Sequence, residues 1–177
     1  MAKPQPKRSK QLVTGGDPEQ LYPQIPAEAD FKKAGCDYVE GSDLEKIGEA
    51  LIEHQGGFGH LRDRKIVYLW KKKGGTRAGK AILGKCQRPT GLLAKFCDAD
   101  WIVWLAADHH GVFRSTRFQV EATVFHELCH TDVDEEKDEA LLVGHDYEGF
   151  CREVELYGAW KGDLEKAVRA FQQLTLI

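Results

Sequence analysis

The stretch FHELCH, residues 125–130, decides how the rest of the chain should be arranged. It places His126 and His130 four residues apart, with Glu127 directly after the first histidine. Residues four apart on an α-helix share one face, one turn apart. Two imidazoles on one face can bind a single zinc ion, for which nitrogen ligands lie about 2.0–2.1 Å away. The glutamate of such a pattern does not bind the metal. It takes a proton from the water that the metal activates.

A second interpretation of this stretch is a pair of surface histidines on an ordinary amphipathic helix. HExxH is a short pattern that also arises by chance, but its flanks favour a metal site. Thr116 and Gln119 form a capping-box pattern, which predicts a helix start. An apolar stripe at helical spacing follows, formed by Phe118, Ala122, Phe125 and Cys129. We expect Cys129 to pack in the core with this stripe and not to bind metal.

A catalytic zinc site needs a third protein ligand and keeps one open position. His145, in the segment GHDYEGF, lies fifteen residues after His130. That separation allows a helix end, a loop and a return to the same ion, and Gly144 gives the backbone freedom to turn inward. We favour His145 as the third ligand. The alternatives are carboxylates that follow it, at Glu148, Glu153 and Glu155.

The segment before this helix predicts a small sheet. A capping-box pattern at Ser42 and Glu45 starts a helix that ends at Gly56-Gly57. Three strands are expected, at 65–70, 81–86 and 101–106. The Gly-rich basic connection KKKGGTRAGK suits a hairpin between the first two strands. WIVWLA, residues 101–106, is apolar on both faces, so we expect it inside the sheet.

Several segments are expected to have no part in the chemistry. Asp108-His109-His110 is interpreted as loop surface, with a proton shuttle as the alternative. The acidic run from Asp132 to Asp138 is interpreted as a solvated loop. It lacks the glycine and the bidentate glutamate that a calcium-binding loop has at its sixth and twelfth positions. A helix is expected from about His145 to Gly158, and Asp163 is expected to cap a last one.

Length and composition favour one domain. At 177 residues we expect a flexible basic N-terminal arm over residues 1–30 and a single zinc metallopeptidase-like domain over residues 31–177. The net charge of −3 does not make the whole molecule attractive to nucleic acid. The chain has no run of about 18 apolar residues, so no membrane partner is expected. Five cysteines without a CxxC pair suggest free thiols in a reducing cytoplasm.

VFHELCHTD…GHDYEGFCREVELYGAW, preceded by DADWIVWLAAD, resembles the phage metallopeptidase family, which is zincin-like. LGKC (83–86), followed by HExxH and a later Gly-His, resembles the SprT-like minimal zinc peptidases more distantly. The resemblance implies an α+β fold, a small and mostly antiparallel sheet packed on the active-site helix. It implies His126, His130 and His145 as metal ligands and Glu127 as general base. Gly149 departs from the family pattern, where a glutamate is more usual.

These observations predict a zinc metallopeptidase with one catalytic Zn²⁺, a protein or peptide substrate, and a cytoplasmic location, in the host if the chain is phage-encoded. The edge strand that pairs with an extended substrate is expected at 81–86. Two alternatives remain open. One is a DNA-associated SprT-like protease that finds its substrate with the basic arm and hairpin. The other is a non-catalytic module in which zinc is structural or absent.

Overall fold

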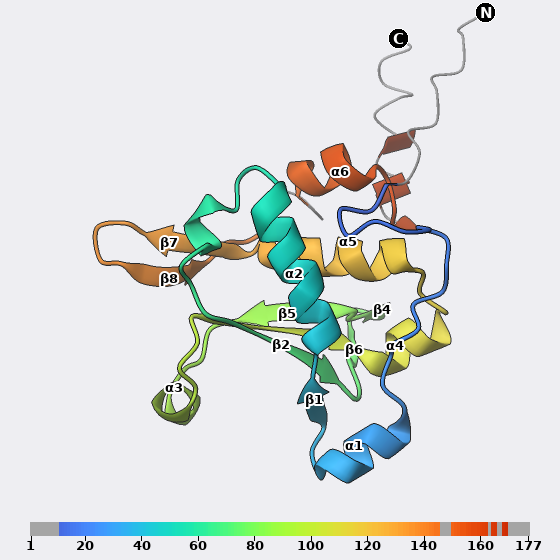
Figure 1. Ribbon diagram of the computed structural model, residues 1–177, viewed down its shortest axis with the longest axis horizontal. Helices are drawn as coiled ribbons and strands as arrows, with labels where there is room; N and C mark the ends of the chain where they lie inside the picture. Colours follow the sequence, from blue (N-terminus) through green and yellow to red (C-terminus); the bar gives the residue numbers. More distant parts are fainter. Residues whose placement is uncertain (1–10, 146–149, 163, 166–167, 170–177) are drawn as a thin grey trace, which may run out of the picture.

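The computed structural model describes residues 11–145, 150–162, 164–165 and 168–169 (Figure 1). The helices are α1 (Glu28–Ala34), α2 (Ser42–His54), η1 (a 3₁₀ turn, Gly59–Leu61), α3 (Leu92–Phe96), α4 (Ala107–Val112), α5 (Arg117–Leu128) and α6 (Cys151–Tyr157). The strands are β1 (Tyr38–Glu40), β2 (Ile66–Lys71), β3 (Thr76–Arg77), β4 (Lys80–Ala81), β5 (Gly84–Gln87), β6 (Trp101–Ala106), β7 (Thr131–Asp134) and β8 (Glu139–Leu142).

The main sheet has the strand order β1-β2-β6-β5. β2 and β6 are parallel, while the β1–β2 and β5–β6 pairs are antiparallel. The α+β fold with a small, mostly antiparallel sheet is therefore confirmed. All six residues of β6 are buried, as its apolar sequence predicts for a strand covered on both faces. β5 lies at the sheet edge, where we expected an edge strand.

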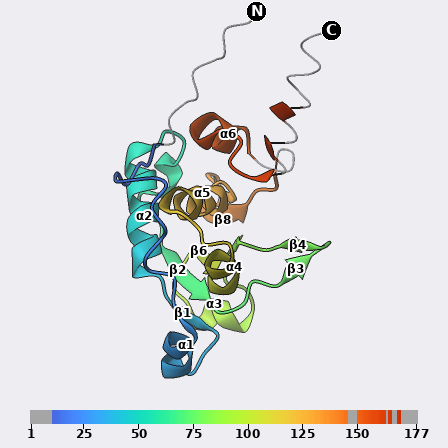
Figure 2. The ribbon, with the colours of Figure 1, turned by 90° about the vertical axis from the view of Figure 1, so that its right-hand side faces the viewer.

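The expected hairpin between strands 65–70 and 81–86 is wrong. β6 lies between β2 and β5, so these two strands do not pair. The basic connection folds into a small antiparallel ladder of its own, β3–β4, which extends away from the main sheet (Figure 2). The physical reason is the composition of β6. Because it is apolar on both sides, the central position buries it best and leaves the more polar β5 at the edge.

Helices α2 and α5 pack on one face of the sheet, and α6 packs on α5 (Figures 1 and 2). The expected capping box at Ser42 is not formed, because Gly41 is the N-cap and Ser42 is the first helical residue. The capping box at the start of α5 is confirmed. The Thr116 N–H donates to the Gln119 side chain, and the Gln119 N–H donates to the Thr116 hydroxyl. Covered by the sheet, α2 and α6, α5 is buried on nearly every side.

Part of the expected N-terminal arm packs against the domain. Leu12 is buried in the core, and the backbone N–H groups of Val13 and Thr14 donate to Glu121 on α5. Leu21 forms a β-bridge with Thr116. The boundary at residue 30 stays a prediction, and residues 1–10 lie outside the described residues.

Three other expectations require correction. The acidic segment is not a plain loop, because β7 and β8 form a hairpin with an exposed turn at 135–138. Asp108-His109-His110 is not loop surface, because β6 runs directly into α4 and His110 is fully buried. The helix expected from His145 begins at Cys151, with Phe150 as its N-cap. Asp163 lies outside the described residues, so its predicted cap stays a prediction.

Candidate metal centre

The C-terminal end of α5 brings His126 and His130 together. α5 ends at Leu128, but the His130 N–H still donates to the Glu127 carbonyl, so the helical turn continues locally. The two imidazole ring centres lie 5.2 Å apart. His126 is buried and His130 is half-buried. The four-residue spacing therefore produces the shared face that the sequence predicts.

The β7–β8 hairpin returns the chain to the same place. Its register pairs Thr131, just after the histidines, with Leu142. The Val143 N–H then donates to the His130 carbonyl at 2.8 Å. His145 follows two residues later, and its ring centre lies 4.9 Å from that of His126 and 4.6 Å from that of His130. The β7–β8 hairpin therefore brings His145 back beside His130, fifteen residues later in the chain.

The three imidazoles fit a tetrahedral cation. One ligating atom from each of His126, His130 and His145 lies within 4.8 Å of the others, and the Nε2 atoms of His126 and His145 are 3.0 Å apart. Zinc–nitrogen bonds of about 2.05 Å at tetrahedral angles place ligand nitrogens about 3.3 Å apart. The donor set is also right, because imidazole suits zinc. Among the described residues this is the cluster that could hold a metal ion.

Comparison with known proteins agrees with this arrangement. A family model described as "Putative phage metallopeptidase" matches residues 36–172. The chain belongs to this family. The match is wider than the motif region alone, since it runs from before β1 through α2 and the sheet to beyond α6. No curated protein and no solved structure matches the chain. None of the described helices of this phage metallopeptidase family member is long and apolar enough to cross a membrane.

The second ring nitrogen of each motif histidine already has a hydrogen-bond partner. His126 Nδ1 lies 2.7 Å from a carboxylate oxygen of Glu153, and His130 Nδ1 lies 2.7 Å from the Val143 carbonyl. Both acceptors require an Nδ1–H donor, so each Nε2 is left with its lone pair. Such contacts orient a metal-binding histidine and increase its basicity.

Glu153, considered from the sequence as a ligand, lies behind His126 instead. It is fully buried on α6 and also accepts hydrogen bonds from the Trp160 indole and, at 3.2 Å, from Lys161. Burial alone would raise the pKa of Glu153, but the hydrogen bond from His126 and the positive charge of Lys161 hold it below its ordinary value. Glu155 is exposed on the same helix, and Glu148 lies outside the described residues.

Glu127 lies against the edge strand β5. It is 4 % exposed, and burial raises its pKa to about 7, although His126 and a backbone hydrogen bond from Cys86 act in the opposite direction. A Cβ atom at Gly84 would come within 2.9 Å of a Glu127 carboxylate oxygen. The absence of a side chain at Gly84 therefore makes room for Glu127. This glycine belongs to the LGKC stretch, residues 83–86, and nothing in its sequence context indicates such a role.

His130 and His145 are held in the form that binds a cation. Burial, followed by the proximity of His126 and His130, lowers the pKa of His145 to about 4. Burial also lowers the pKa of His130. Neutral imidazole is the metal-binding form, so neither residue has to lose a proton near pH 7. Phe150 packs beside all three, with its ring centre 5.0–5.4 Å from theirs.

Proposed function

We propose that this protein is a zinc-dependent metallopeptidase, in which His126, His130 and His145 hold one catalytic zinc ion and Glu127 is the general base. The observation that carries the proposal is the convergence of the three imidazoles, two of which have Nδ1 bonded to acceptors behind the site. Membership of a metallopeptidase family supports a protein or peptide substrate.

The reaction would be hydrolysis of a peptide bond without a covalent enzyme intermediate. Zinc held by the three histidines would supply a Lewis acid that polarises the peptide carbonyl and acidifies the attacking water. Glu127 takes a proton from this water as its oxygen bonds to the carbonyl carbon. Glu127 then passes that proton to the amine nitrogen as the carbon–nitrogen bond breaks. A carboxyl group with a pKa near 7 can perform both transfers at neutral pH.

Metal analysis of purified protein tests the ligand set. We expect one zinc ion per chain in the wild type and a large loss of zinc affinity in His145→Ala. His54→Ala is the matched control, because His54 is an exposed histidine on α2 and should leave zinc content unchanged. Zinc content in His145→Ala equal to that of the wild type would remove His145 from the site. A wild type that binds no zinc would refute the whole proposal.

The coordination number distinguishes a catalytic ion from a structural one. X-ray absorption at the zinc edge should show three imidazole nitrogens and one water oxygen, since a catalytic site keeps one position open. A fourth protein ligand would instead support the non-catalytic module. The zinc-loaded wild type should also cleave an unstructured protein substrate, and removal of zinc by a chelator should stop the cleavage.

A further inference from the structure

Positive charge is concentrated in one segment of the chain. Residues 64–97 contain ten cationic side chains and no acidic one, although the whole chain has a net charge of −3. All 28 acidic residues therefore lie elsewhere, together with the other 15 basic ones. The cationic residues are Arg64, Lys65, Lys71, Lys72, Lys73, Arg77, Lys80, Lys85, Arg88 and Lys95. This segment comprises β2 to β5 and α3, so the charge belongs to one part of the fold.

The strands direct Lys71 and Lys85 to the face of the sheet opposite α2 and α5. Tyr68 and Cys86 belong to the core shared with the helices, so their strand neighbours point the other way. Lys85 on β5 and Leu69 on β2 flank Trp104 of β6, according to the strand register. Trp104 is buried but is not part of that helix-side core. Figures 1 and 2 show α2, α5 and α6 together on the other side of the sheet.

Lysine side chains and aromatic rings alternate on this second face. The Lys71 ammonium lies 4.3 Å from the centre of the Trp104 ring and 5.8 Å from that of Tyr38. Lys85 is exposed on the other side of Trp104. The basic connection KKKGGTRAGK contains no aromatic residue of its own. The structure adds rings from β1 and β6, strands distant in the sequence.

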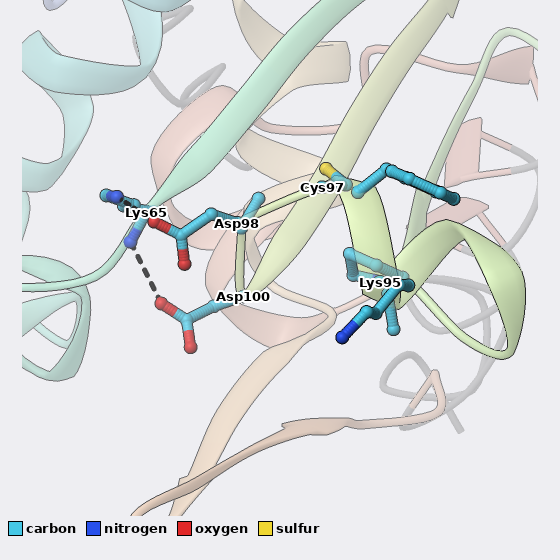
Figure 3. A pocket seen from close by; sticks show the side chains of 9 residues that line it. Lys65, Lys95, Cys97, Asp98 and Asp100 are labelled. Carbon is cyan, nitrogen blue, oxygen red and sulfur yellow. Dashed lines mark hydrogen bonds and ion pairs between the residues drawn. The ribbon is translucent and has the colours of Figure 1, made fainter.

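The positive charge continues beyond both ends of the strands. Exposed Lys73 and Arg77 lie in and beside the β3–β4 hairpin, and exposed Lys95 lies on α3 next to Phe96, which is 81 % exposed. Other cations of the segment are paired. Lys65 bonds to Asp98 at the hollow of about 410 Å³ in Figure 3, where Lys95 is also seen. Arg64 pairs with Asp100 and Asp138, and Lys72 with Glu28.

We propose that this surface binds nucleic acid through its phosphates. We define the basic face as Lys71, Lys85, Lys73, Arg77 and Lys95. A linear polyanion fits best, because the cations are spread from α3 across the sheet to the hairpin and a small anion would meet only one or two of them. Lys71 and Lys85 of the basic face lie on the opposite side of the sheet from α5 and the metal centre. Gly84 faces Glu127, and the next residue, Lys85, faces away. Nucleic acid bound there leaves the metal centre open to peptide.

Binding to labelled single-stranded DNA of about 20 nucleotides, measured by fluorescence anisotropy from about 50 to about 200 mM salt, tests the proposal. The wild type should bind at low salt and weaken as salt rises. The double variant Lys71→Glu/Lys85→Glu should bind at least about tenfold more weakly. Its salt dependence should be shallower by about 1.4 in slope, because two phosphate contacts are lost. The control Lys46→Glu/Lys137→Glu makes the same charge change on exposed lysines of α2 and the β7–β8 turn. It should bind within about twofold of the wild type.

Several results would overturn the proposal: no DNA binding by the wild type at low salt, an equal loss in the control, or binding of anionic vesicles without binding of DNA. Glutamine variants of the cationic residues in 1–10 test the N-terminal arm. Loss of binding there, with none in the double variant, would also reject the basic face. Circular dichroism and urea denaturation of each variant check its fold. If Lys71→Glu/Lys85→Glu fails this check, Lys71→Gln/Lys85→Gln replaces it, with a smaller expected loss. Because DNA binding and zinc binding are measured separately, failure of either proposal leaves the other standing.

Discussion

Two buried glutamates lie six residues apart on α5, in contrasting environments. Glu121 is fully buried and accepts from the Val13 and Thr14 N–H groups, the Thr14 hydroxyl and, at 3.2 Å, the Tyr157 hydroxyl. Glu127 is nearly as buried, but it lies against Gly84 and has a pKa raised to about 7. A buried carboxylate surrounded by donors joins parts of the fold, whereas one with little compensation for burial is ready to exchange a proton.

The difference follows from what packs on each half of the helix. The N-terminal half is covered by a chain segment whose backbone donors must be satisfied, and Glu121 satisfies two of them. The C-terminal half is covered by an edge strand that presents a glycine to Glu127. One helix thus carries a structural carboxylate and, by our proposal, a catalytic one. Substitutions at each should affect different properties.

Glu127→Gln should have the largest effect. The amide keeps the size of the side chain but cannot take a proton from water, so turnover should fall by about 10³-fold or more. Zinc content should stay at the wild-type level, because Glu127 is not a proposed ligand. Cleavage of the same unstructured substrate, with zinc measured in the same samples, checks both points. An unchanged cleavage rate would show that Glu127 is not the base.

Glu121→Leu should instead reduce stability. The change leaves buried donors of Val13, Thr14 and Tyr157 without an acceptor, which should cost about 3 kcal/mol of unfolding free energy. Urea denaturation measures this loss, with Tyr157→Phe as a milder variant that removes one donor. Turnover per folded molecule should change far less than in Glu127→Gln. A large loss of turnover at full stability would show that the two glutamates are not divided in this way.

Glu153→Gln tests the support behind the proposed ligands. The amide weakens the charged hydrogen bond to His126 Nδ1 and removes a negative charge near Lys161. Loss of such an outer contact lowers metal affinity by about 10–100-fold. Competition with a zinc indicator measures the affinity, and Glu155→Gln, an exposed position on the same helix, is the control. Equal affinity in Glu153→Gln and wild type would show that Glu153 only packs there.

Local patterns predicted those parts of the fold that depend on neighbours in sequence. Six apolar residues were enough to place β6 inside the sheet, and Thr116 and Gln119 formed the cap that their spacing predicts. The four-residue spacing placed His126 beside His130, and His145 lies with them as expected. That these histidines bind zinc stays a prediction.

Features that depend on distant partners could not be predicted in this way. Glu121 meets Val13 across 108 positions, and the space for Glu127 comes from Gly84 on another strand. The strand order also escaped prediction, because it depends on which strand gains most from burial on both faces. Glu153 was considered as a metal ligand. Its position in the sequence does not show that its carboxylate approaches His126 Nδ1 and not the metal position.

The same contrast exists between the histidines of the candidate metal centre and His110, which is buried elsewhere in the core. The expected effect of His110 on stability is smaller than that of Glu121. His110 is fully buried before the start of α5, where its Nδ1 lies 2.8 Å from the Ser115 hydroxyl, and burial lowers its pKa to about 4. The unfolded chain binds a proton at this residue near pH 6.5, so its contribution to stability is present above that pH and is lost as pH falls toward 4. Between pH 7 and pH 5 the loss should be about 1–2 kcal/mol. Urea denaturation at pH 7 and at pH 5 measures this loss of unfolding free energy. In His110→Gln the loss between the two pH values should be smaller by that amount, because all other titrating groups are shared. An imidazole pKa near 6.5 for His110, measured by NMR, would contradict a histidine held neutral by the core.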